Sequence, residues 1–286
     1  MRCSYPVKIK DPHNPGEYIE VPCGQCTACR INYGLNWSIR VKHELEMHDF
    51  SLWCCLTYND VHLSLQNMEY KNGHYNSLER RELQLFLKNF RRDVEPLKVR
   101  FFACGEYGDK FGRPHYHIII FGISPEHPYF KDKYKVYRDG EFAGWRIDRL
   151  PSWPHGHVEI DKDTAGTKAA RYVAKYMLKK RKGKGAKEYY EKQGISPEFI
   201  AMSLKPGIGA TGIDKHAKYY RDNQKATLDG KTYNLSRYMV DRVGNALDID
   251  FDEQIKLNHA EYRKTHPKKD DFNGHQQEQT LKKGKR

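Results

Sequence analysis

The chain has 286 residues, of which 38% are apolar without counting its 22 glycines, so it can fold around a core. A count of 50 Lys and Arg against 37 Asp and Glu gives a formal net charge of +13, which favours a polyanionic partner such as nucleic acid. We expect no membrane partner, because no segment approaches the roughly 20 apolar residues of a membrane span and the start lacks the apolar stretch of a signal peptide. Seven cysteines, an odd number in a reducing compartment, argue against a disulfide framework.

The N-terminal part of the chain is rich in cysteine. Cys23, Cys26 and Cys29 form a CxxCxxC pattern, and Cys3 offers a fourth thiolate. Four thiolates suit a tetrahedral structural zinc site, so the sequence predicts one here. Two alternatives stay open: free buried thiols, and ligation of an iron–sulfur cluster, although the cysteine before a proline that such motifs contain is missing. We expect these cysteines in a tight loop that leads into a helix containing Trp37.

The middle of the chain alternates between strand and helix patterns. Residues 50–58 form an apolar run between polar residues, which predicts a buried strand. Ser77 is the expected N-cap of a helix in which leucine and phenylalanine recur at helical spacing, and this helix ends before Pro96. Residues 98–107 and 115–121 predict two strands joined by the turn GDKFGRP, so they should form a hairpin. The cysteines within these strands should lie in the core: Cys54, Cys55 and Cys104.

A polar insertion follows the hairpin, and a short strand and a helix are predicted beyond it. The strand covers residues 157–160, and the helix begins at Asp163 or Thr164 and runs to about Lys180. From Arg181 onward a glycine- and lysine-rich linker leads into a segment that mixes helical stretches with turns. Strands interrupted by helices in this order predict an α+β fold, with a central antiparallel sheet and helices packed on it.

Two histidines stand at the start of the second hairpin strand. Because side chains alternate along a strand, His115 and His117 share one face and Tyr116 faces the other. Two imidazoles on one face can ligate the same cation. A chain with 14 histidines also contains such pairs by chance, so this pattern by itself leaves metal binding open.

Two tyrosines share one face of the predicted helix after Thr164. Tyr172 and Tyr176 lie four residues apart, and the same face carries Lys168, Lys175 and Lys179. A tyrosine hydroxyl, with a pKa of about 10, needs a positive environment to become a nucleophile, and Lys175 supplies part of it. With a cation on the histidines to polarise a phosphodiester, attack would leave a 5′-phosphotyrosine and a 3′-hydroxyl. The alternative is a pair of half-exposed tyrosines on a cationic helix.

Together these motifs resemble those of the HUH endonucleases. That family is named for two histidines around a bulky hydrophobic residue, here HYH at 115–117, and carries one or two tyrosines on a downstream helix, here YVAKY at 172–176. CLTY, which ends at Tyr58, resembles the first motif of rolling-circle initiators, although the cysteines at 54–55 replace the Thr or small residue more common there. GEYG, GRPHYHIIIFG and VPCGQCTACR are most similar to the replication proteins of gokushovirus-like microviruses. The resemblance covers roughly residues 1–182.

The resemblance implies a divalent metal site. His115 and His117 would bind Mg²⁺ or Mn²⁺ together with a third, acidic or polar ligand. Glu106 is the candidate, provided that the hairpin register places it opposite one of the histidines. A glutamate that merely flanks the turn is the alternative, and His157 and Glu159 are second candidates.

The resemblance also implies an enzyme that nicks single-stranded DNA at a phage replication origin through Tyr172 or Tyr176, with Lys175 beside them, and later rejoins the strands. The candidate phosphate contacts are Arg113, Lys168 and Lys179. The partners would be origin DNA and host helicase or replication proteins, in the cytoplasm of the bacterial host. A plasmid initiator, relaxase or transposase would use the same chemistry. A non-enzymatic zinc protein that binds single-stranded nucleic acid is the alternative outside the enzymes.

These expectations divide the chain into four regions, and the resemblance implies a ferredoxin- or RRM-like sheet in the second. The regions are a Cys-rich arm at residues 1–36, an HUH catalytic domain at 37–182, a partly helical basic extension at 183–263 and a disordered tail at 264–286.

Overall fold

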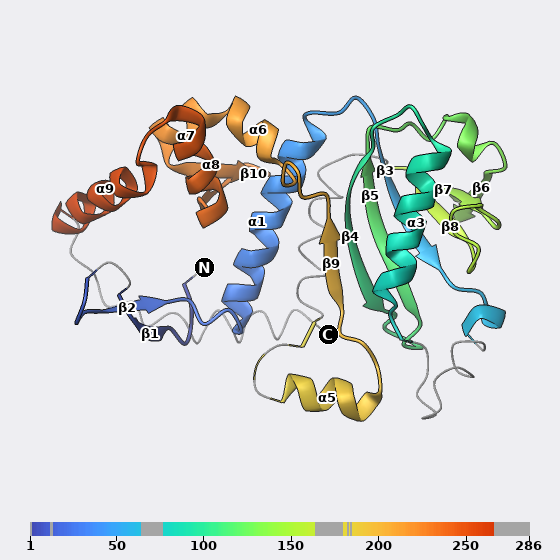
Figure 1. Ribbon diagram of the computed structural model, residues 1–286, viewed down its shortest axis with the longest axis horizontal. Coiled ribbons are helices and arrows are strands. Elements are labelled where there is room, and N and C mark those ends of the chain that lie inside the picture. Colours follow the sequence, from blue (N-terminus) through green and yellow to red (C-terminus); the bar gives the residue numbers. More distant parts are fainter. Residues whose placement is uncertain are drawn as a thin grey trace. The chain divides into compact units, whose positions relative to one another are not determined.

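The computed structural model of the protein is drawn in Figure 1. It describes residues 2–11, 14–63, 77–163, 180–181, 183 and 185–265. The chain divides into two compact units, residues 38–212 and residues 1–37 with 213–286. Among the described helices, none combines the length and the apolar character needed to span a membrane.

An antiparallel sheet forms the centre of the larger unit. Its described strands are β3 (Ser51–Thr57), β4 (Arg100–Tyr107), β5 (Pro114–Phe121), β6 (Tyr134–Arg138), β7 (Glu141–Ile147), β8 (Val158–Asp161) and β9 (Phe199–Met202). Their order is β6-β7-β8-β3-β5-β4-β9, and each neighbouring pair is antiparallel. The predicted α+β fold with a central antiparallel sheet is therefore confirmed. The strand predicted at 50–58, the hairpin of β4 and β5 and the short strand at β8 all lie where the sequence places them.

One face of the sheet is covered by α3 (Arg80–Asp93), as Figure 1 shows. The apolar positions of this helix recur at helical spacing, so they all reach the sheet. They are Leu83, Phe86, Leu87 and Phe90, and they share one buried core with the sheet residues Leu56, Tyr116, Ile118 and Ile160. The opposite face of β3, β4 and β5 is the one that carries His115 and His117.

The N-cap predicted at Ser77 is wrong, because α3 begins at Arg80 with Glu79 as its N-cap. Hydroxyl groups of the sheet satisfy the amides ahead of this helix: the Tyr116 hydroxyl accepts from the Glu79 amide at 2.9 Å, and the Tyr107 hydroxyl accepts from the Leu78 amide. The Ser77 hydroxyl instead accepts a hydrogen bond from the Ser196 amide at 2.9 Å. Capping is thus supplied by distant tyrosines, which a local pattern does not reveal.

Three strands were missed by the sequence analysis. β6 and β7 form a hairpin inside the region expected to be a polar insertion, which also contains the short 3-10 helix η1 (Pro128–Phe130). β6 is an edge strand whose side chains are mostly exposed, so it lacks the apolar alternation that marks a half-buried strand. β9 follows α5 (Ala186–Gln193) and pairs with β4 at the other edge of the sheet.

The remaining elements belong wholly or partly to the smaller unit. Helix α1 (Thr27–Leu45) contains Trp37, as predicted, and runs from one unit into the other. The other elements are β1 (Val7–Lys10), β2 (Tyr18–Val21), α6 (Ala210–Lys215), α7 (Ala217–Asn223), β10 (Lys225–Leu228), β11 (Lys231–Asn234), α8 (Arg237–Leu247) and α9 (Phe251–Thr265). The C-terminal extension is therefore partly helical, as expected. The tyrosine helix predicted up to residue 179 and the tail from residue 266 lie outside the described residues.

Candidate functional site

Strand register brings one carboxylate and two imidazoles together. In the β4–β5 hairpin Glu106 is the cross-strand partner of His115, and His117 lies two residues further along the same face. Oε1 of Glu106 lies 2.8 Å from Nε2 of His115 and 3.2 Å from Nε2 of His117. One ligand atom from each of the three residues lies within 4.8 Å of the other two. The register that the sequence left open is thus the one in which Glu106 shares the face of the histidines.

The charge state of Glu106 follows from these contacts. The side chain is buried, and burial alone raises the pKa of its carboxyl group. Hydrogen bonds from His115 and His117 outweigh that effect, so the pKa is about 2 and Glu106 is a carboxylate. A carboxylate between two imidazoles presents a set of donors that binds divalent cations.

The tautomer of His115 is also determined by its surroundings. Nδ1 of His115 lies 3.1 Å from the carbonyl oxygen of Arg113, and a carbonyl oxygen can only accept, so Nδ1 carries the proton. The lone pair of the neutral ring is then on Nε2, the nitrogen that faces Glu106. A second partner that orients a ligating imidazole in this way is a common feature of metal sites. The two imidazole nitrogens and one carboxylate oxygen therefore fit a cation such as Mn²⁺ or Mg²⁺.

Tyr116 lies on the opposite face of β5, as predicted, and is fully buried. Its hydroxyl lies 2.7 Å from that of Tyr58 and donates to the carbonyl oxygen of Glu79 at 3.0 Å, while Tyr58 also donates to Glu82. Burial raises the pKa of both phenols, so they remain neutral. This network fixes the strand between the two histidines from below and leaves neither phenol available as a nucleophile.

A hollow of about 290 Å³ lies beside His117 on the same face of the sheet. The side chains that line it are aromatic, charged or polar, and include Trp53, Cys55, Arg138, Trp145 and Glu159. Cys55 is opposite both His117 and Glu159, and is partly exposed, so its expected place in the core is wrong, whereas Cys54 and Cys104 are buried. Alternation along β3 already places Trp53, Cys55 and Thr57 on one face, and this pattern could have identified them.

The second ligand candidates form a separate pair next to this hollow. Glu159 accepts a hydrogen bond from Arg138 at 2.5 Å, and its carboxylate lies 3.8 Å from Nε2 of His157. The cluster of three ligand atoms described above contains neither of them. Arg113 donates to Asp60 at 2.8 Å and to the Tyr58 carbonyl at 3.0 Å, which holds its half-exposed guanidinium near His115.

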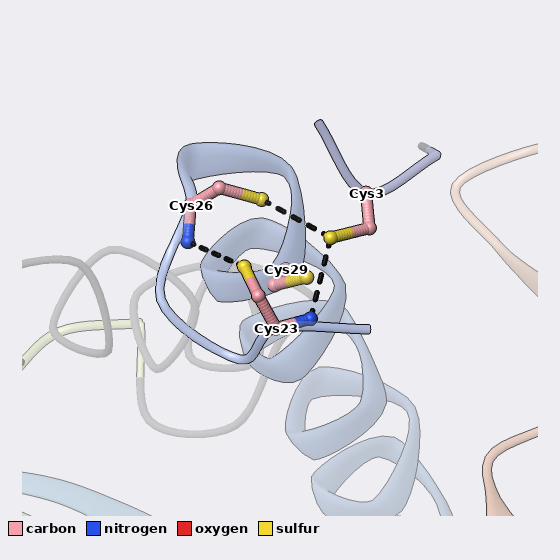
Figure 2. Close-up of side chains that lie close together, drawn as sticks. All are labelled: Cys3, Cys23, Cys26 and Cys29. Atoms are coloured by element: carbon pink, nitrogen blue, oxygen red, sulfur yellow. Dashed lines mark hydrogen bonds between the residues drawn. The ribbon is translucent and has the colours of Figure 1, made fainter. Parts of the chain in front are cut away.

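The remaining predicted site residues fall into two groups. Those on the tyrosine helix lie outside the described residues: Lys168, Tyr172, Lys175, Tyr176 and Lys179. The N-terminal cysteines come together in the smaller unit, where the Sγ atoms of Cys3, Cys23, Cys26 and Cys29 lie within 4.8 Å of one another (Figure 2). The described residues thus contain two clusters of predicted ligands, one of imidazole and carboxylate and one of thiol groups.

Comparison with known proteins gives a consistent result. The profile of the replication-associated protein ORF2 family matches residues 51–181, a segment that contains both the ligand cluster and the tyrosine motif. Replication-associated protein ORF4 of Chlamydia phage 1 is 28% identical over 249 residues, 82% of this chain, which spans only 56% of that relative's length. Replication-associated protein VP4 of Bdellovibrio phage phiMH2K is 27% identical, covering 87% of this chain and 76% of the relative.

A third relative is more similar in sequence. Replication-associated protein ORF2 of Spiroplasma virus 4 is 31% identical over 236 residues, which cover 78% of this chain and 67% of the relative. No solved structure matches the chain.

Proposed function

This chain belongs to the family of replication-associated proteins found in phages such as Spiroplasma virus 4, and from that membership we propose that it initiates rolling-circle replication. In this proposal it nicks single-stranded DNA at the phage origin, becomes linked to the cut strand and later rejoins the ends. The observation that carries the proposal is the cluster of Glu106, His115 and His117, whose ligand atoms lie within 4.8 Å of one another. A replication protein that only binds DNA has no need for such a cluster.

The cluster would hold Mg²⁺ or Mn²⁺, and the bound cation would polarise the scissile phosphate. Glu106 supplies the negative charge, and the Arg113 carbonyl orients His115 so that Nε2 faces the site. The hollow beside His117 offers the rings of Trp53 and Trp145, which suit stacking of unpaired bases. These features support a single strand lying across this face of the sheet.

The nucleophile in this proposal is Tyr172 or Tyr176. The phenolic oxygen attacks the phosphorus, the bond from phosphorus to the 3′ oxygen breaks, and that oxygen leaves as a 3′-hydroxyl after taking up a proton. The strand stays attached through a 5′-phosphotyrosine. Attack of a 3′-hydroxyl on that linkage reverses the step and releases the tyrosine. Lys175 would favour the phenolate, and a second tyrosine allows a second transfer while the first is occupied.

A cleavage assay tests this proposal. We expect a labelled single-stranded oligonucleotide carrying the origin to form a covalent adduct with the protein in Mn²⁺, and EDTA to abolish it. The double variant Tyr172→Phe, Tyr176→Phe should form none, while Tyr219→Phe, which removes an exposed hydroxyl on α7, should match the wild type. An adduct in the double variant would show that another residue is the nucleophile.

The same assay distinguishes the other functions. If the wild type binds the oligonucleotide but never cleaves it, the protein is a binding protein and the cluster has another use. If it cleaves plasmid or transposon ends but not the phage origin, the chemistry is right and the biological role is different. Host helicase or replication proteins would be partners in the bacterial cell, since the nicked strand must be unwound before it can be copied.

A further inference from the structure

Four cysteine thiols converge at the start of α1. Cys3 comes from the N-terminal segment, Cys23 from the loop after β2, and Cys26 and Cys29 from the beginning of the helix (Figure 2). All four Sγ atoms lie within 4.8 Å of one another, and those of Cys3 and Cys26 are 3.8 Å apart. Zn–S bonds of about 2.3 Å in a tetrahedron place the sulfurs about 3.8 Å apart, whereas a disulfide requires about 2.05 Å. The separation therefore matches one shared ion and excludes a disulfide in this arrangement.

Backbone amides are directed at these sulfurs. The amides of Gln25 and Cys26 donate to Sγ of Cys23 at 3.4 and 3.3 Å, and the amide of Cys23 donates to Sγ of Cys3 at 3.3 Å. Gly24 adopts a φ of +73°, which permits the tight turn that brings these amides round. Amide donors stabilise thiolates, the form that binds metals.

Little else holds the N-terminal hairpin in place. β1 and β2 pair from Val7↔Val21 to Lys10↔Tyr18, yet nearly all of their side chains are exposed. A two-stranded hairpin without a buried face is marginal in water. Cys3 and Cys23 flank it on either side, so a shared ion would close the hairpin into a loop fastened to α1.

We propose that Cys3, Cys23, Cys26 and Cys29 bind one structural zinc ion that anchors the β1–β2 hairpin to the start of α1. The site has four protein ligands and no open position, which is the form of structural zinc sites. An iron–sulfur cluster distributes its cysteine ligands over several irons and so holds their sulfurs farther apart than a single ion does. Zinc is therefore the ion that this spacing fits.

Elemental analysis and X-ray absorption on the purified full chain test the proposal. We expect one zinc ion per chain, surrounded by four sulfurs at about 2.3 Å. Iron with inorganic sulfide, or metal-free protein with a disulfide among these cysteines, would overturn it. Because both measurements use the wild type, they do not depend on whether a variant folds.

Variants then assign the ligands. The double change Cys23→Ser, Cys26→Ser should remove the zinc and speed proteolysis at Lys8 and Lys10 at least tenfold, because the hairpin is released. Cys54→Ala is the matched control: its thiol lies in the core, where burial raises its pKa to about 12, and we expect a full complement of zinc. Zinc retained by the double variant would mean that the ion is bound elsewhere.

Discussion

Glu106 is a buried carboxylate that two imidazoles on the neighbouring strand stabilise. The histidine pair could be found from the sequence because alternation along a strand is strict. The contribution of Glu106 depends on the pairing of β4 with β5, and a slip of one residue would have pointed it to the other face. Cys55 was misplaced for a related reason: its strand is apolar on both faces, so the pattern does not show which face meets the core.

Substitutions at the cluster should separate cleavage from binding. We expect Glu106→Gln and His117→Ala each to reduce adduct formation at least about 100-fold, because loss of even an outer partner of a metal costs 10–100-fold. Affinity for single-stranded DNA should change less than about threefold. Glu188→Gln on α5 is the control for removing an exposed carboxylate. Equal losses of binding and cleavage, with unfolding seen by circular dichroism, would mean that the cluster is structural.

A second buried carboxylate, Glu44, makes stability depend on pH. Burial raises its pKa, but hydrogen bonds from His48, Arg100 and the Gly209 amide outweigh that effect and bring it to about 2. Since the folded pKa is below the unfolded value of 4.5, the stabilisation is complete above about pH 4.5 and is lost as the pH falls towards 2.

We therefore expect Glu44→Gln to lower the free energy of unfolding by about 3 kcal/mol at neutral pH. Urea denaturation at pH 7 and at about pH 3.5 measures this difference. The gap between wild type and variant should shrink by about 1 kcal/mol at the lower pH. A gap that is the same at both values would show that the ionisation of Glu44 contributes nothing.

At the scale of elements, the sequence predicts those whose apolar residues are periodic. β3, α3 and the β4–β5 hairpin are of this kind, since each buries one regular face. The edge strands β6 and β9 were missed because pairing of their backbones, rather than burial of their side chains, places them in the sheet. The N-cap of α3 was misjudged because tyrosines distant in sequence supply the capping hydroxyls.

Gly144 in β7 shows how closely two of these strands approach. Its φ is +144°, and a Cβ there would lie 2.1 Å from the Ile160 carbonyl oxygen of β8. We expect Gly144→Ala to lower the free energy of unfolding by about 2 kcal/mol or more, measured by urea denaturation. Gly140→Ala is the matched control, since its φ is +80° but its surroundings are open, and it should cost only about 1 kcal/mol. Equal costs would show that the contact with β8 relaxes freely.

At the scale of the whole molecule, the charge of +13 suits a protein whose substrate is a polyanion. We expect the affinity for single-stranded DNA to fall at least about tenfold between 50 and 200 mM salt, since each phosphate contact releases counterions. The Tyr172→Phe, Tyr176→Phe variant is suited to this titration because it should bind without forming a covalent link. An affinity that does not change with salt would contradict an electrostatic mode of binding.

The attachment of DNA to a tyrosine is the central claim, and mass spectrometry of the adduct tests it most directly. After reaction with the origin oligonucleotide, trypsin cuts at Arg171 and Lys175, so the two tyrosines fall on separate peptides, residues 172–175 and 176–179. We predict a 5′-phosphorylated nucleotide on the tyrosine of one or both peptides, formed only when Mn²⁺ or Mg²⁺ is present. A nucleotide on any other residue, or an adduct that forms equally well in EDTA, would contradict the account.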